Sequence, residues 1–159
     1  IRIDNPAIMG SDLVCAAVGA LQKFKPPMII FDLGTATTIS AIDRTGALIG
    51  GSIFPGVNVS LNALSSSTAQ LPHIDPEFTG NVVIGANSSD SMKSGIVLGT
   101  AAMMDGMIDR YKEILGEDVT VLATGGLAPS IAKHCRREVI ISPDLICDGL
   151  YVIYKKNAE

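Results

Sequence analysis

The chain has 159 residues, of which 47% are hydrophobic and 18% charged, and its formal net charge is −4. This composition predicts one globular domain with a buried core and excludes an intrinsically disordered chain. The mildly acidic balance, without a dense cluster of Lys and Arg, argues against nucleic acid as a partner. No apolar run reaches the roughly 20 residues that a membrane span needs. Three scattered cysteines without a CxxC pair are typical of a cytoplasmic protein with reduced thiols.

Periodicity and turn residues predict a helix, three strands, two helices and then an alternation of strands and helices. The predicted strands span 28–31, 37–42, 47–54, 119–123 and 138–141; the predicted helices span 11–24, 57–69, 88–115, 128–134 and 143 onward; and 71–82 is expected to be a loop. A tight turn at 44–46 joins the second and third strands, so we expect the first three strands to form an antiparallel meander. A mixed sheet of this kind with flanking helices is α/β in class.

Capping residues predict where the helices begin. Ser11 is a suitable N-cap for the first helix, and Ser88 or Ser89 for the long helix. We expect the last helix to have Ser142 as its N-cap and Pro143 at its first position.

A short turn, Asp32-Leu33-Gly34-Thr35, follows the first predicted strand. Gly34 lets the backbone turn sharply and approach a ligand, because it has no Cβ. Backbone N–H groups and the Thr35 hydroxyl present donors to phosphate oxygens, and Asp32 supplies an oxygen ligand for a cation. An ordinary hairpin turn with an Asx-type hydrogen bond is the alternative, and the turn alone does not separate the two.

A second glycine turn, Gly125-Gly126, lies between an apolar strand and a predicted helix. Paired glycines let the backbone approach a flat or anionic ligand, and a helix N-terminus favours negative charge. Taken alone, this segment would equally suit a plain strand-to-helix turn. Together, the two turns resemble the nucleotide site of the actin, Hsp70 and sugar-kinase superfamily. Neither a P-loop nor a G-x-G-x-x-G fingerprint occurs in the sequence.

The order of the short motifs resembles that of the type III pantothenate kinases of bacteria, through the whole chain. The matching segments are Asp4 to Pro6, Gly10 to Asp12, Phe31 to Thr38, Gly50 to Gly56, Leu71-Pro72, Asn87-Ser88, Ser91 to Gly95, Ala123 to Ala128, Pro143 to Leu145 and Gly149-Leu150. The resemblance implies a ribonuclease H-like (actin-like ATPase) fold. It also implies phosphorylation of pantothenate by ATP, which is the first step of coenzyme A biosynthesis.

Carried over by position, the resemblance implies a role for several residues. Asp12 would be the general base that takes the proton from the substrate hydroxyl, since an ionised Asp suits phosphoryl transfer. Asp32 would hold the monovalent cation, potassium or ammonium, that the family requires. Magnesium would accompany ATP. The implied substrate-binding residues are Gly10, Ser11, Asp12, Leu13 and Ser88, and the implied ATP-binding residues are Gly34, Thr35, Gly125 and Gly126.

Two departures from the family pattern affect these expectations. Leu13 stands where the family has an Arg, which would pair with the pantothenate carboxylate in a bidentate way. The family's first phosphate loop, Asp-x-Gly-Asn-Thr, does not occur in this sequence. We therefore expect residues 1–159 to be a single domain, the C-terminal half of a two-lobed kinase, and to be inactive alone.

The resemblance also implies a homodimer with shared active sites. A helix with Gly95, Gly99, Ala102 and Gly106 along one side is the candidate interface, although packing within one chain is the simpler interpretation of such small residues. Two alternatives to the pantothenate kinase remain open. One is a non-catalytic, nucleotide-binding regulator of the same fold, which Leu13 favours. The other is a kinase for a different small molecule.

Overall fold

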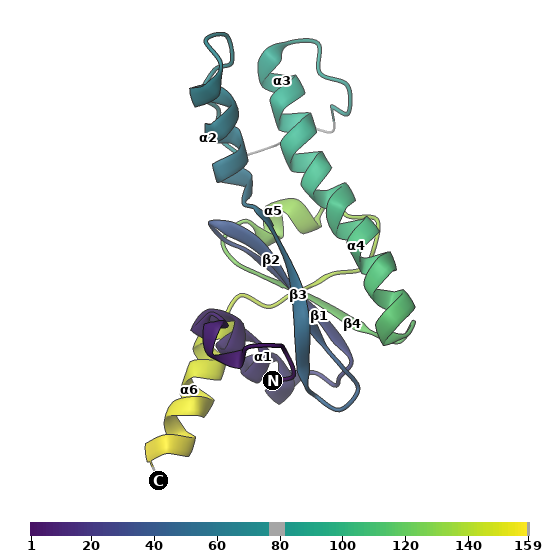
Figure 1. Cartoon of the computed structure of the whole chain (residues 1–159). Coiled ribbons are helices and arrows are strands. Elements are labelled where there is room, and N and C mark those ends of the chain that lie inside the picture. The colour runs from purple at the N-terminus through teal and green to yellow at the C-terminus, as the bar shows by residue number, and fades with distance from the viewer. Residues whose placement is uncertain (77–81, 159) are drawn as a thin grey trace.

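The structure is a computed structural model that describes residues 1–76 and 82–158. These residues form a five-stranded sheet in the order β3-β2-β1-β4-β5 (Figure 1). The strands are β1 (Met28–Leu33), β2 (Ala36–Ile42), β3 (Leu48–Pro55), β4 (Thr120–Thr124) and β5 (Ile140–Ile141). The first three form the predicted antiparallel meander, and β4 and β5 extend it in parallel to five strands. The predicted α/β mixed sheet is confirmed.

Helices flank both faces of this sheet. The helices within the described residues are η1 (Pro6–Ile8), α1 (Ser11–Lys23), α2 (Val57–Ser67), α3 (Ser88–Lys93), η2 (Ser94–Leu98), α4 (Gly99–Leu115), α5 (Ala128–Ala132) and α6 (Leu145–Ala158). No helix within the described ranges is both long and apolar enough to cross a membrane.

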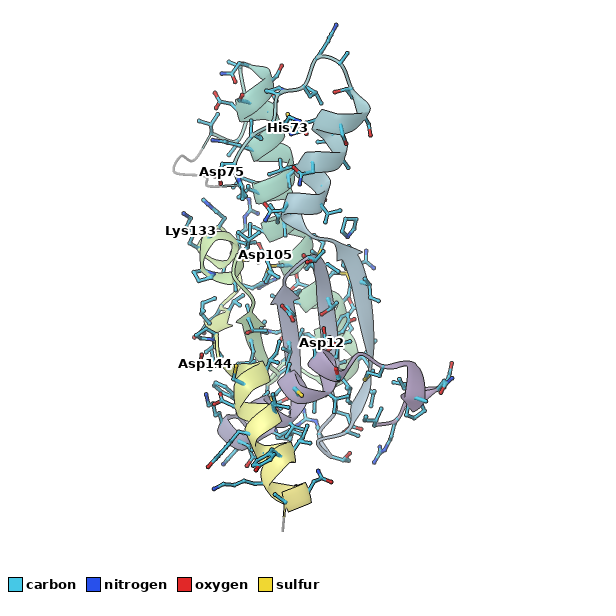
Figure 2. The ribbon with its side chains drawn as sticks, turned by 90° about the vertical axis from the view of Figure 1, so that its left-hand side faces the viewer. Asp12, His73, Asp75, Asp105, Lys133 and Asp144 are labelled. Atoms are coloured by element: carbon cyan, nitrogen blue, oxygen red, sulfur yellow. The ribbon has the colours of Figure 1, made fainter. Side chains whose placement is uncertain are left out.

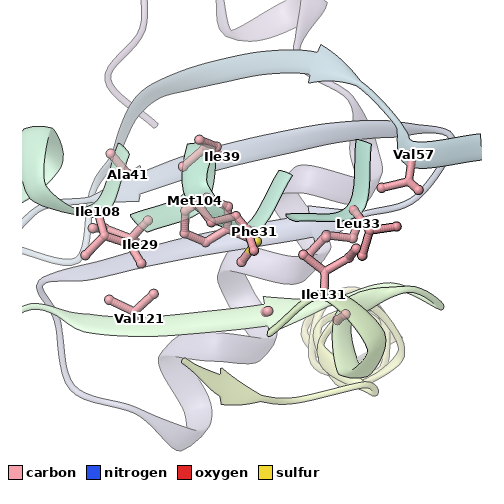
Figure 3. Close-up of a cluster of buried hydrophobic side chains, with 14 of the residues drawn as sticks. Ile29, Phe31, Leu33, Ile39, Ala41, Val57, Met104, Ile108, Val121 and Ile131 are labelled. Carbon is pink, nitrogen blue, oxygen red and sulfur yellow. The ribbon is translucent and has the colours of Figure 1, made fainter. Parts of the chain in front are cut away.

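The central strand β1 is buried on both faces because it is almost continuously apolar. Ile29, Phe31 and Leu33 point to one face and pack in a large core with Met104 and Ile108 of α4 (Figure 3). The intervening side chains point to the opposite face, which packs against α1 and α6 and is called the α1 face below. The α1 face holds a smaller core of Ala16, Ala17, Ala20, Met28, Ile30, Ile42, Leu48, Leu122 and Leu145.

Three predicted helix starts are wrong by one or two residues. The N-cap of α1 is Gly10 and not Ser11, and the N-cap of α3 is Asn87, whose side-chain oxygen accepts the Asp90 N–H at 2.9 Å. An amide side chain caps as well as a hydroxyl, so the serines that follow were equally plausible candidates. Helix α6 begins at Leu145, so Pro143 precedes the helix instead of opening it.

The predicted long helix is interrupted. The segment η2 is a π-helix between α3 and α4. The Thr100 hydroxyl donates to the Ile96 carbonyl at 2.6 Å, and such a bond to the preceding turn distorts a helix locally. The predicted C-terminal stop at Gly116 is confirmed by its positive φ of 104°.

The helices α2 and α3 lie side by side and project away from one end of the sheet (Figure 1). Of the predicted 71–82 loop, residues 71–76 have no helix or strand, 82 has none either, and 77–81 lie outside the described residues.

Candidate active site at the carboxyl ends of β1 and β4

The two predicted glycine turns leave the same edge of the sheet. Strands β1 and β4 pair in parallel, with Asp32 opposite Thr124. The segments that follow, Leu33 to Thr35 and Gly125-Gly126, therefore emerge side by side. Ligands of open α/β sheets bind at the carboxyl ends of parallel strands, so this edge is the natural place for a site.

Gly125 brings the two turns into contact. Its φ is +93°, a conformation that residues with a Cβ rarely adopt. A Cβ at this position would lie 2.8 Å from Asp32 Oδ1 and 2.7 Å from the Leu33 carbonyl oxygen. A glycine is therefore required here for the turn after β4 to approach the turn after β1.

Gly56 packs directly against the backbone of Gly34 and Thr35, a contact that the sequence did not reveal. Its N–H donates to the Thr35 carbonyl at 3.1 Å. A Cβ on Gly56 would lie 2.6 Å from the Gly34 carbonyl oxygen and would also collide with that of Thr35. The sequence showed Pro55-Gly56 as the end of a strand and as part of a family-matching segment, but nothing in a sequence shows which distant backbone packs on a glycine.

Asp12 and Asp32 lie near each other on the α1 face. Asp12 is exposed in the first turn of α1, beside the strands (Figure 2). Asp32 is partly buried, and its pKa is raised above the ordinary value, first by burial and then by the charge of Asp12. A Cβ on Gly10 would collide with the Asp12 carboxylate, so Gly10 leaves room for that side chain. The structure thus brings together two of the predicted site carboxylates.

Asp32 belongs to a row of side chains across four strands. The register pairs Ile53 with Thr38, Thr38 with Asp32, and Asp32 with Thr124. Register partners point to the same face of a sheet, with Cβ atoms about 4.5–5.5 Å apart in antiparallel pairs. The Thr38 hydroxyl is buried and has no hydrogen-bond partner among the described residues. An unsatisfied buried hydroxyl is unusual and indicates a missing partner.

The helix that carries Asp12 is held against α6 by close backbone contact. A Cβ on Gly149 of α6 would lie 2.6 Å from the Cys15 carbonyl carbon and 2.9 Å from the Gly19 nitrogen. An ion pair between Lys23 and Asp148 joins the same two helices. These contacts fix α1, and with it Asp12, relative to the sheet.

A second connection ties α6 to the end of β4. The Thr124 hydroxyl donates to the Pro143 carbonyl at 3.2 Å, just before α6 begins. Thr124, which directly precedes Gly125, therefore links the glycine turn to the segment that leads into α6.

The other predicted substrate-binding residues lie in two different places. Ser88 is exposed at the start of α3, in the part of the molecule that projects away from the sheet (Figure 1). Ser11 is exposed beside Asp12, and Leu13 lines a small cavity next to it. Helix α5 after Gly126 has only five residues, so its dipole adds little to an anion site.

Asp32 is not part of a multidentate metal site in the described residues. No group of three or more His, Cys, Asp and Glu side chains that could hold a metal occurs within the described ranges. Within residues 1–76 and 82–158, no Lys or Arg forms an ion pair with Asp32. A partly buried carboxylate beside a second carboxylate, without a protein counter-charge, fits a site completed by a bound cation.

Comparison with known proteins shows the family of this chain. The sequence profile of the type III pantothenate kinases matches residues 1–110. A type III pantothenate kinase of Rubrobacter xylanophilus is 44% identical over 99% of this chain, and one of Thermobifida fusca is 40% identical over 99%. The chain spans 62% of the length of each of these two relatives.

Solved structures share the fold at low sequence identity. A Campylobacter jejuni protein described as a conserved Baf family transcriptional activator has a TM-score of 0.69 and 19% identity, over 99% of this chain and 69% of that one. An archaeal actin homolog has a TM-score of 0.52 and 13% identity, over 91% of this chain and 54% of that one. The fold is therefore actin-like, and the profile match shows that the chain belongs to the type III pantothenate kinase family.

Proposed function

We propose that the protein containing this chain transfers the γ-phosphoryl group of ATP to the primary hydroxyl of pantothenate, the entry step to coenzyme A. The observation that carries this proposal is the meeting of Asp12, Asp32 and the two glycine turns at one edge of the sheet. Phosphoryl transfer requires chiefly alignment and charge neutralisation, with a carboxylate to receive a proton. The name shared by the relatives supports the choice of acceptor.

Asp12 is the proposed general base. It is exposed at the start of α1, so an acceptor hydroxyl can reach it from solvent. The proton of that hydroxyl passes to the Asp12 carboxylate as the oxygen attacks the γ-phosphorus. The bond from phosphorus to the bridging oxygen breaks, and ADP leaves with that electron pair.

ATP is proposed to lie along the two glycine turns. Gly34 and Thr35 are exposed at the end of β1. The Gly34 N–H donates to the Ala36 carbonyl at 3.2 Å, so the donors proposed for the phosphate oxygens are the Thr35 N–H and hydroxyl. Gly126 would lie at the adenosine end together with Gly125, because a Cβ on Gly126 would meet nothing within 4 Å in the described residues. Magnesium would enter with the nucleotide. The family's first phosphate loop would lie in the part of the relatives' length that this chain does not span.

Asp32 is the proposed ligand of a monovalent cation, potassium or ammonium. Such an ion would neutralise charge next to the phosphates and would offset the repulsion between Asp32 and Asp12. Burial and the charge of Asp12 raise the pKa of Asp32, and a bound cation would stabilise its ionised form.

The acceptor is proposed to contact Gly10, Ser11 and Leu13 around Asp12. Ser88 would contact it only from a second copy of the chain, since its own α3 projects away from the sheet. The homodimer that this requires would use Gly95, Gly99, Ala102 and Gly106, all of which are exposed.

The test is ADP release by the intact protein that contains this chain, measured with ATP, magnesium and potassium, with and without pantothenate. We expect release to depend on pantothenate and to produce an equal amount of 4'-phosphopantothenate. ADP release that ignores pantothenate would point to another acceptor or to a plain ATPase.

One residue favours a second candidate, a nucleotide-binding regulator without catalytic activity. Leu13 cannot form the bidentate pair with a carboxylate that an Arg would form. This candidate predicts ADP binding by calorimetry together with no phosphoryl transfer to pantothenate in the assay above.

A further inference from the structure

A cavity of about 440 Å³ lies beside the amino-terminal end of β4, on the face of the sheet that packs against α4. Its floor is apolar and consists of Ile108, Val119 and Val121, which are buried. Its rim carries charged side chains of both signs, which are Lys112, Glu117, Arg136, Arg137 and Glu138. Gly125 follows the other end of β4, about 13 Å along the strand from Val121. The cavity is therefore separate from the candidate active site.

The backbone of Val121 presents an unused donor to this cavity. Successive N–H groups of a strand point to opposite neighbours, and the Thr120 N–H donates to the Pro27 carbonyl at 3.0 Å, beside β1. The Val121 N–H therefore points to the other edge of β4, where β5 begins only at Ile140. It donates to no carbonyl of the described segment that precedes β5. A buried N–H without an acceptor is rare and indicates a missing partner.

Two side chains on the rim are also available as donors. The Arg136 guanidinium forms no ion pair within residues 1–76 and 82–158, whereas Arg137 is held by Asp109 at 2.9 Å. Lys112 contacts Glu117 at 3.4 Å, and the Glu117 side chain is 88% exposed. A surface pair of this kind contributes little free energy, so the Lys112 ammonium can turn to another acceptor.

We propose that this cavity binds a phosphate group, as the free ion or as a phosphate monoester. The guanidinium of Arg136, the ammonium of Lys112 and the N–H of Val121 come from three separate segments and match the three unesterified oxygens of such a group. The apolar floor leaves room for a small organic remainder. Glu117 competes with the phosphate for Lys112, so its removal strengthens binding. The inference is independent of the proposed function.

The test follows the backbone amide of Val121 by NMR in the intact protein labelled with ¹⁵N-valine. Val121→Ile assigns the resonance, because its signal is absent from that variant. Inorganic phosphate and glycerol 3-phosphate are titrated separately against chloride at constant ionic strength, with ADP and magnesium present to occupy the nucleotide site. We expect a saturable shift of the Val121 resonance, and the probe that binds more tightly identifies the free ion or the monoester as the ligand.

Two variants should change the dissociation constant in opposite directions. Arg136→Gln should raise it about tenfold, from the loss of a charge-assisted hydrogen bond. Glu117→Gln should lower it about threefold, because Lys112 loses its competing partner. Arg110→Gln is the matched control, since Arg110 is exposed on α4 outside the lining and its replacement removes the same charge. The control should leave the constant within about twofold of the wild type.

Three results would overturn the inference. The first is a Val121 resonance that neither probe shifts to saturation. The second is an equal dissociation constant in Arg136→Gln and Arg110→Gln, which would reduce the effect to net charge. The third is weaker binding in Glu117→Gln. Phosphoryl transfer to pantothenate is measured separately, so the proposed function would stand in each case.

Discussion

At the scale of single residues, Asp32 is a carboxylate in an otherwise apolar strand, where burial disfavours its charge. It lies within β1, between side chains that are fully buried, and its carboxylate has neither a counter-charge nor a hydrogen-bond donor among the described residues. An apolar side chain at this position would avoid the free-energy cost of burying a charge and would make the fold more stable. A carboxylate at this position agrees with the proposed role of Asp32 in ligand binding.

The raised pKa of Asp32 predicts the sign of a stability change. The folded state binds the Asp32 proton more tightly than the unfolded state, so this group lowers stability as pH rises from about 4, its unfolded pKa, through the folded pKa. We expect Asp32→Asn to raise the thermal midpoint at pH 7, without added potassium, and to have a smaller effect near pH 4.

Asp43→Asn is the matched control with the opposite sign. Hydrogen bonds from Thr45 and Ala47 lower the pKa of Asp43, so its charge stabilises the fold above the unfolded pKa and this contribution is lost as pH falls. That substitution should lower the midpoint at pH 7. A lower midpoint in Asp32→Asn as well would show that Asp32 is a structural residue.

The proposed cation role gives Asp32 a second prediction. Turnover of the intact protein should rise with potassium in the wild type, because the ion neutralises charge beside the phosphates. In Asp32→Asn we expect turnover to fall by about a hundredfold and to lose its dependence on potassium. A potassium titration with the same half-saturation in both proteins would contradict this role.

At the scale of elements, the sequence predicted most helices and strands but not their contacts. The apolar run at β1 and the β-branched run at β2 were sufficient to place the meander. The neighbouring positions of β1 and β4 were not predictable, because nothing local records a parallel pairing between segments so far apart. Motif order gave the candidate site residues, and the parallel pairing explains why the turns after Asp32 and Thr124 meet.

The contact between α1 and α6 was also invisible in the sequence, and it predicts a sensitive position. Gly149→Ala would place a Cβ against the Cys15 carbonyl and force the two helices apart. We expect a loss of about 1–3 kcal/mol in the free energy of unfolding, measured by urea denaturation. The exposed neighbour Leu150 supplies the control, since Leu150→Ala should stay within about 0.5 kcal/mol of the wild type. Equal effects of both substitutions would show that the helices do not meet at Gly149.

At the scale of the whole molecule, the chain is an actin-like unit that spans about three fifths of its relatives' length. The pair of helices α2 and α3 projects from it, and the stripe of Gly95, Gly99, Ala102 and Gly106 is exposed. A Cβ built on any of the three glycines meets nothing within 4 Å in the described residues. Open space along one helix side agrees with the proposed interface between two copies.

This interface predicts a change of oligomeric state. Ala102→Glu would place a charge at the centre of the stripe, where a close helix contact cannot hydrate it. We expect the intact protein to be a dimer by light scattering, and this variant to be a monomer. The control Gln22→Glu adds the same charge on exposed α1 and should remain dimeric. A monomeric wild type, or a dimeric Ala102→Glu, would refute the proposed interface.

The central claim is that Asp12 acts as the base in a site shared with Asp32. It is tested most directly by phosphoryl transfer from γ-labelled ATP to pantothenate, measured for the intact protein and for Asp12→Asn at pH 7 with potassium and magnesium. The variant keeps the size of the side chain at an exposed position, so it should fold normally. We predict a loss of about 10²–10⁴-fold in the transfer rate, with unchanged ADP affinity. Labelled phosphopantothenate formed equally fast by both proteins would contradict the account.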